Sequence, residues 1–155
     1  MIRLQKFLRL ARENQRLVLR SVMVLAAVRI GLSFLRFRTV DGLVTRRARR
    51  RATLVSQRNH SAERIAWAVS AVSRYVPGAT CLPQALAAHF LLTRHGHRSI
   101  IRLGVTTKGT ETLTGHAWVE TDGAVFFQGD NPSRYIQLPF PDAEPVALLS
   151  RGAGR

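Results

Sequence analysis

The stretch Gly78-Ala79-Thr80-Cys81-Leu82-Pro83-Gln84-Ala85-Leu86 contains the single cysteine of this 155-residue chain and has the pattern of a helix start. Thr80 is a suitable N-cap, because its hydroxyl can accept a hydrogen bond from an N–H of the first turn. Pro83 is tolerated in that turn, because the N–H groups there have no intrahelical acceptor. The sequence therefore predicts that Cys81 is the first residue of a helix.

Cys81 at this position has the placement of a catalytic nucleophile. The positive end of a helix dipole favours thiolate over thiol. Downstream, Gly115-His116-Ala117-Trp118-Val119-Glu120-Thr121-Asp122-Gly123 predicts a strand and a hairpin turn that display His116 on one face. His116 either takes the thiol proton or already holds it as imidazolium. The alternative is a buried structural cysteine, but such a residue has no need of a helix start.

Four blocks of sequence, in this order, resemble the transglutaminase-like leader peptidases of lasso peptide biosynthesis. They lie at 81–87, 91–97, 102–105 and 115–123, within a resemblance that covers about residues 60–140. The resemblance implies an α+β fold of the transglutaminase or papain type, with a nucleophile helix packed on an antiparallel sheet. It also implies a Cys-His-Asp peptidase that cuts the leader from a ribosomally made precursor, while a separate ATP-dependent cyclase closes the macrolactam ring.

The third catalytic residue departs from the family pattern. Many members carry an aspartate about twelve residues beyond the histidine, where this chain has Gln128. A two-residue turn would pair Thr121 with Ala124 and place His116 opposite approximately Gly129. The nearest carboxylate is then Asp130, which we choose as the third residue.

Two alternatives to Asp130 remain open. Gln128 could hold the imidazole through its amide oxygen, as an asparagine does in some Cys-His proteases. Asp122 lies at the predicted hairpin tip, too far along the strand to reach the ring, and is better explained as a turn residue.

The chain divides into a basic helical N-terminal extension at 1–58, a catalytic domain at 59–150 and a disordered tail at 151–155. Ser61 is expected to cap a second helix that ends at Pro77-Gly78, and Gly96 to end the cysteine helix near His95 in the left-handed conformation. The remaining expected elements are a helix or broken helix pair at 3–36, a connection or short helix through Asp41-Gly42 and the arginine run, strands at 99–106, 116–120 and 125–128, and an edge strand at 135–138.

Charge is distributed unevenly along the chain. Residues 1–60 hold 15 of the 24 lysines and arginines and two acidic residues, whereas residues 61–155 are nearly neutral. Arg46-Arg47-Ala48-Arg49-Arg50-Arg51 is the densest run and by itself suggests an anionic partner or a solvated helix face. The basic half lacks the interleaved aromatic residues of a single-strand nucleic-acid binder, so we expect no nucleic acid partner.

The stretch from Leu17 to Leu35 is apolar but is interrupted by Arg20 and Arg29. An arginine near the centre of a span costs about 2.5–3.5 kcal/mol on insertion scales. We therefore expect a long helix with an apolar face that packs on the catalytic domain or on a partner. The protein is expected to be cytoplasmic, with peripheral association with the inner membrane as an alternative.

Neither a metal nor a cofactor is expected, because the chain contains no Cys-x-x-Cys or His-Glu-x-x-His motif. We interpret His60, His89, His95 and His97 as surface or helix-end residues. The expected partners are the precursor peptide, the cyclase, and a separate leader-recognition protein, because the assigned elements leave no room for such a domain. The competing functions are a transglutaminase-type acyltransferase and a basic nucleic-acid-binding or membrane-binding module.

Overall fold

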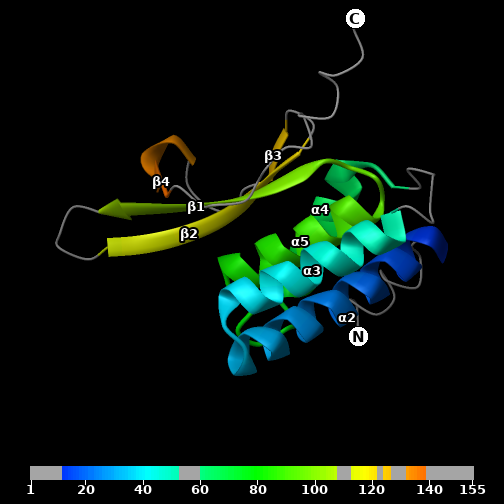
Figure 1. The fold of residues 1–155 in the computed structure, drawn as a ribbon. Coiled ribbons are helices and arrows are strands. Elements are labelled where there is room, and N and C mark those ends of the chain that lie inside the picture. Colours follow the sequence, from blue (N-terminus) through cyan, green and yellow to red (C-terminus); the bar gives the residue numbers. More distant parts are fainter. Residues whose placement is uncertain (1–11, 53–59, 108–112, 122–123, 127–131, 139–155) are drawn as a thin grey trace, which may run out of the picture.

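The computed structural model describes residues 12–52, 60–107, 113–121, 124–126 and 132–138, and within them a layer of helices packs on one face of an antiparallel sheet (Figure 1). This arrangement confirms the predicted α+β class. The helices are α2 (Arg12–Phe34), α3 (Phe37–Ala52), α4 (Ala62–Ser73) and α5 (Cys81–Arg94), with the 3₁₀ helix η1 (Pro132–Arg134). The strands are β1 (Ser99–Thr107), β2 (Leu113–Thr121), β3 (Ala124–Phe126) and β4 (Ile136–Gln137).

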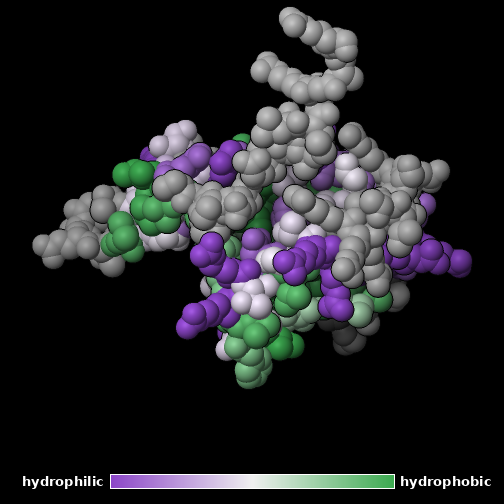
Figure 2. Space-filling model, in the orientation of Figure 1, coloured by the Kyte–Doolittle hydropathy of each residue, from purple (hydrophilic) through white to green (hydrophobic). Residues whose placement is uncertain are grey.

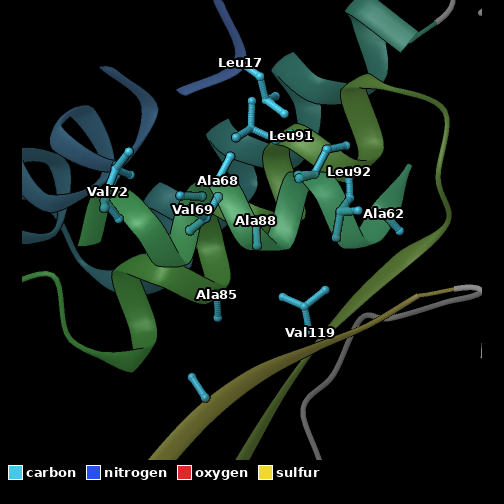
Figure 3. Packing of buried hydrophobic residues seen from close by; sticks show 14 residues of the cluster. Leu17, Ala62, Ala68, Val69, Val72, Ala85, Ala88, Leu91, Leu92 and Val119 are labelled. Carbon is cyan, nitrogen blue, oxygen red and sulfur yellow. The ribbon is translucent and has the colours of Figure 1, made fainter. Parts of the chain in front are cut away.

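Helix α5 is the centre of the domain, since it contacts α2, α3 and α4 as well as β1 and β2. Small residues on the facing surfaces, among them Ala68, Ala85 and Ala88, let these elements approach closely (Figure 3). Larger apolar side chains fill the space around them, and burying each one contributes about 1.5–3 kcal/mol. The fully buried ones among them are Leu17 and Leu25 of α2, Ile65 of α4, Leu91 and Leu92 of α5, and Val119 of β2.

The N-terminal helices share this core. Leu17 and Leu25 belong to the same buried cluster as Ile65 of α4, and α3 packs on α5. The predicted boundary at residue 58 lies within 53–59, outside the described residues, and stays a prediction. The described helices before this boundary pack directly on the described elements after it.

The sheet has the order β3-β2-β1-β4, with every neighbouring pair antiparallel. Strand β2 pairs with β1 in a register that sets His116 opposite Gly104. Strand β4 is an edge strand, as expected; it pairs with β1 and sets Gln137 opposite Gly104. Thr121 pairs with Ala124 across the β2–β3 hairpin, which is the predicted register.

Most predicted helix boundaries are confirmed, with two corrections: one concerns a cap, and the other is the end of α4, which lies at Ser73 instead of at Pro77-Gly78. Ser61 caps α4, where its Oγ accepts a hydrogen bond from the N–H of Arg64 at 3.3 Å. Gly96 follows α5 with φ of 82°. Thr80 is the N-cap residue of α5, but its side chain makes no cap hydrogen bond, contrary to our expectation.

The segment expected as a connection or short helix is the 16-residue helix α3. Its Val40 is buried in a cluster with Val28 of α2 and Leu86 of α5, and Ala48 is fully buried as well. Tertiary burial of one face therefore extends the helix through a segment with an unfavourable run of like charges.

By length and composition alone, α2 could cross a membrane, although the sequence argument rejected a span because of Arg20 and Arg29. In the structure its Leu17, Leu25 and Val28 are buried, and α2 packs on α4 and α5. This face of α2 is therefore part of the domain core.

The four histidines interpreted as surface or helix-end residues are all buried, so the surface interpretation is wrong, whereas His95 does end α5 as its C-cap residue. His95 is 4% exposed, and its ring meets the ring of His60 edge-on with centroids 5.2 Å apart. Nε2 of His97 lies 2.8 Å from the backbone oxygen of His60. Nδ1 of His89 lies 2.9 Å from Oγ of Ser99, so the helix layer covers polar as well as apolar groups.

Candidate active site

A cavity of about 320 Å³ lies between α4, α5 and the β2–β3 hairpin. Cys81 and His116 both line it, so the structure brings the predicted nucleophile and base to one cleft. Both side chains are partly buried. The other lining residues are mainly apolar and include Trp67 and Val69 of α4, Ala85 and Ala88 of α5, Trp118 and Val119 of β2, and Val125 and Phe126 of β3.

Cys81 is the first residue of α5, as predicted. The turn before it is held by Gln84, whose Nε2 donates a hydrogen bond to the backbone oxygen of Ala79 at 2.6 Å. Because Thr80 makes no side-chain cap bond, its hydroxyl does not occupy the first-turn N–H groups, which point out of the N-terminal end of a helix. These groups can therefore stabilise negative charge beside the thiol.

His116 enters the cleft from β2. Its ring lies beside the ring of Tyr135, with centroids 5.4 Å apart and planes inclined at 40°. Burial lowers the pKa of His116 from its ordinary value of 6.5, because a desolvated imidazole resists protonation. The ring is therefore mostly neutral at neutral pH, which favours a base that takes the thiol proton over one that already holds it.

The profile of the transglutaminase-like superfamily matches residues 24–138, about three quarters of the chain. The chain belongs to the transglutaminase-like superfamily. Comparison with curated proteins and with solved structures gave no significant match. The superfamily supports a cysteine peptidase or acyltransferase type of activity, in agreement with a thiol and an imidazole in one cleft.

In this superfamily member, the wall beside His116 is built on a close contact at Gly104. A Cβ at Gly104 would lie 2.9 Å from both the Trp118 ring and the Cβ of Tyr135. Only a residue without a side chain lets these two rings approach β1. Trp118 is 1% exposed, and its ring centroid lies 6.3 Å from that of Tyr135, so it packs into this wall.

Trp118 is fixed further by a polar chain along the sheet. Its Nε1 donates to Oε1 of Glu120 at 3.3 Å, and Oε2 of Glu120 accepts from Nε of Arg102 at 3.0 Å. Because Glu120 is paired with Arg102, it neutralises a charge instead of acting on substrate. His116, Trp118 and Glu120 occupy every second position of β2 and therefore share one face of the strand, while Ala117 and Val119 lie on the other.

The cleft also contains polar groups that the sequence analysis did not predict. Glu63 lines it, and hydrogen bonds from its own backbone N–H and from Ser61 lower the pKa of its carboxyl, which is ionised at neutral pH. Oε1 of Gln84 is buried without a donor among the described residues. An unsatisfied acceptor in a cleft can bind an N–H group of a substrate.

Asp130, Gln128 and Asp122 lie outside the described residues, so the third catalytic residue stays a prediction. The described pairs from Val119↔Phe126 to Thr121↔Ala124 do have the register on which the choice of Asp130 rests. Among the described residues, no group of three or more His, Cys, Asp or Glu could hold a metal ion.

Tyr135 was assigned to an edge strand and was not considered as a site residue. It is separated from β2 in sequence, and only the pairing of β4 with β1 brings it to His116. Gln84 could have been found from its position three residues after Cys81, which places both side chains on neighbouring turns of one helix face.

Proposed function

We propose that this protein is a cysteine peptidase that removes the leader peptide from a ribosomally made lasso peptide precursor. The observation that carries the proposal is the common cleft of Cys81, at the N-terminus of α5, and His116, on β2. The four sequence blocks that resemble lasso leader peptidases contribute these two residues and their surroundings. A thiol at a helix N-terminus that shares a cleft with a neutral imidazole supports the proposal of an activated nucleophile.

In the proposed reaction, Sγ of Cys81 attacks the carbonyl carbon of the scissile peptide bond while His116 takes the thiol proton. The tetrahedral oxyanion is stabilised by N–H groups at the start of α5, including that of Cys81. Collapse of this intermediate breaks the C–N bond, and His116 gives its proton to the leaving amine. Water then attacks the thioester, His116 takes a proton from it, and the Cys81 thiolate leaves.

Asp130 is our choice for the residue that orients His116 in this reaction. A carboxylate that accepts a hydrogen bond from the other ring nitrogen fixes the tautomer and stabilises the imidazolium that forms. Gln128 and Asp122 are the alternatives. We also propose that a separate leader-recognition protein presents the precursor, that the ATP-dependent cyclase acts on the product, and that the reaction takes place in the cytoplasm.

The deciding experiment follows cleavage of a synthetic precursor peptide by mass spectrometry. Cys81→Ala and His116→Ala should each abolish cleavage without loss of the folded state, because both side chains line a cavity and are only partly buried. Thr80→Ala is the matched neighbour, since its exposed side chain makes no cap bond, and it should cleave like the wild type. Full cleavage by Cys81→Ala would overturn the thiol mechanism.

The same assay separates hydrolysis from acyl transfer, which the superfamily also supports. If an added primary amine appears covalently attached to the acyl product, the thioester is resolved by an amine, and the protein is an acyltransferase. If the leader carries a free carboxylate even at high amine concentration, water resolves the thioester. If the protein cleaves no precursor, and if Cys81→Ala retains the function of the wild type, the protein is better explained as a binding module.

A further inference from the structure

Helix α2 exposes an apolar stripe on the face opposite the core. The stripe consists of Leu19, Met23, Ile30 and Phe34, whose exposed fractions run from 59% to 83%. These positions recur at helical spacing along one side of α2, while Leu17, Leu25 and Val28 are buried on the other. A contiguous exposed patch of large apolar side chains indicates a surface that another layer covers.

Arginines flank the α2 stripe at both ends. Arg12 and Arg16 are exposed and continue the same helical face toward its start. Arg36 and Arg38 are exposed just beyond its end. Leu35 in the α2–α3 turn is exposed as well. Figure 1 shows this turn at the lower end of the molecule, and Figure 2 shows a hydrophobic patch there with hydrophilic residues beside it.

We propose that the α2 stripe is a docking surface for an anionic membrane, on which α2 lies in the plane of the interface. An apolar stripe with arginines beside its ends fits the boundary between acyl chains and anionic headgroups, because the four side chains of the stripe enter the apolar layer while the guanidinium groups stay at the phosphates. The stripe is about 22 Å long at the rise of an α-helix, enough for several lipids.

The fold favours docking on a membrane over crossing it. Although α2 is long and apolar enough to span a bilayer, its inner face supplies Leu17 and Leu25 to the common core. A spanning α2 would remove these side chains from α4 and α5 and open that core. In-plane docking uses only the exposed face and leaves the core closed.

Charge argues against a second copy of this chain as the occupant. Residues 1–60 carry a net charge of +13, with Glu13 and Asp41 as their acidic residues. Two such surfaces facing one another would repel. The docking surface also leaves the catalytic cleft accessible, because α2 lies at the side of the helix layer away from the sheet (Figure 1), whereas the cleft lies between α4, α5 and the β2–β3 hairpin.

The test is sedimentation of the full-length protein with two kinds of vesicle, one of phosphatidylcholine alone and one that also contains phosphatidylglycerol. We expect binding to the anionic vesicles at least about tenfold stronger than to the neutral ones, and weaker at high salt. Ile30→Gln/Phe34→Gln should reduce binding about tenfold or more without a change in charge. Ile136→Gln is the matched control, because Ile136 is 75% exposed on the sheet edge, and should bind like the wild type.

A second pair of variants isolates the contribution of charge. Arg36→Gln/Arg38→Gln should weaken binding to anionic vesicles, whereas Arg98→Gln/Arg134→Gln, which removes the same charge from exposed sites of the sheet layer, should have a smaller effect. Equal losses for the two pairs would show that net charge alone drives binding and would overturn the assignment of this face. Circular dichroism of each variant confirms that it is folded.

Two other outcomes would also overturn the proposal. If the protein binds neither kind of vesicle, the α2 stripe is covered by a protein. If it forms a dimer in solution by light scattering, and Ile30→Gln/Phe34→Gln makes it monomeric, the occupant is a second copy. Since vesicle binding is measured without substrate, its failure would leave the proposed peptidase activity untouched.

Discussion

The ring of Tyr135 lies against the ring of His116, with centroids 5.4 Å apart, although His116 is on β2 and Tyr135 lies between η1 and β4. Because burial is the cause of the lowered pKa of His116, the structure links Tyr135 to the protonation of the proposed base. The contact therefore bears on the pH range of the enzyme as well as on the shape of the cleft.

Tyr135→Ala should raise the pKa of His116 toward 6.5, because water would reach the imidazole. The neutral ring is the active form of the base, so the acid limb of kcat/KM against pH should shift upward and activity below that limb should fall. Tyr75→Ala is the matched control, as Tyr75 is 61% exposed at the end of α4. An unchanged acid limb in Tyr135→Ala would show that another group desolvates His116.

Gly104→Ala should destabilise the protein by about 1–3 kcal/mol, because the added Cβ would overlap both the Trp118 ring and the Cβ of Tyr135. Relief of the overlap displaces the wall beside His116, so kcat should fall as well. Gly42→Ala is the contrasting change, because nothing lies within 4 Å of an added Cβ at this helical position, and should stabilise by about 0.5–1 kcal/mol. Urea unfolding and steady-state kinetics would measure both effects.

Ser61→Ala should lower the free energy of unfolding by about 1 kcal/mol, because it removes the acceptor of the Arg64 N–H at the start of α4. Thr80→Ala at the start of α5 should be nearly silent, since the Thr80 side chain makes no such bond. The pair tests the corrected cap directly in chemical denaturation. If Thr80→Ala lowered the free energy of unfolding as much as Ser61→Ala does, the Thr80 side chain would cap α5 as the sequence predicted.

The buried histidines should make the protein less stable in acid. Burial lowers the pKa of His95 to about 4, with added repulsion from His60, Arg94, Arg20 and His97. Burial also lowers the pKa of His60, where Glu13 opposes the shift and Arg64 and Arg20 add to it. As pH falls below 6.5 the unfolded chain binds protons on these rings, whereas the folded chain does so only at lower pH. The free energy of unfolding should therefore fall from pH 6.5 toward about 4, where His95 alone accounts for at most about 3 kcal/mol.

His95→Gln should make that decline shallower. Its free energy of unfolding would be measured by urea denaturation at closely spaced pH values between 8 and 4, with the wild type as the reference. The comparison at pH 8 gives the packing effect of the substitution, and the change in slope gives the effect of protonation. A slope equal to that of the wild type would assign the acid sensitivity to other groups.

Asp130→Ala should lower kcat by orders of magnitude with little change in KM, because an orienting residue acts in the transition state instead of in binding. Asp122→Ala should be nearly silent. If Gln128→Ala lowers kcat more than Asp130→Ala does, the Gln128 amide is the group that accepts the hydrogen bond from His116. Single-turnover kinetics with the precursor peptide would distinguish these outcomes.

Local sequence determined the elements that carry the reacting groups. Cys81 begins α5, Ser61 caps α4, Gly96 follows α5 at positive φ, and Thr121 pairs with Ala124. Each of these features depends on residues a few positions apart, through a cap, a glycine conformation or a two-residue turn. Short-range interactions of this kind can be inferred without knowledge of the rest of the fold.

Only the tertiary structure decided what those elements touch. The arginine-rich segment forms helix α3 because its Val40 and Ala48 are buried by packing on α2 and α5. The four histidines are likewise buried by the packing of the helix layer. Tyr135 reaches His116 only through the β1–β4 pairing. Burial and contact between distant segments depend on how all elements pack together, and a pattern read along a single segment contains no information about the segment that will cover it.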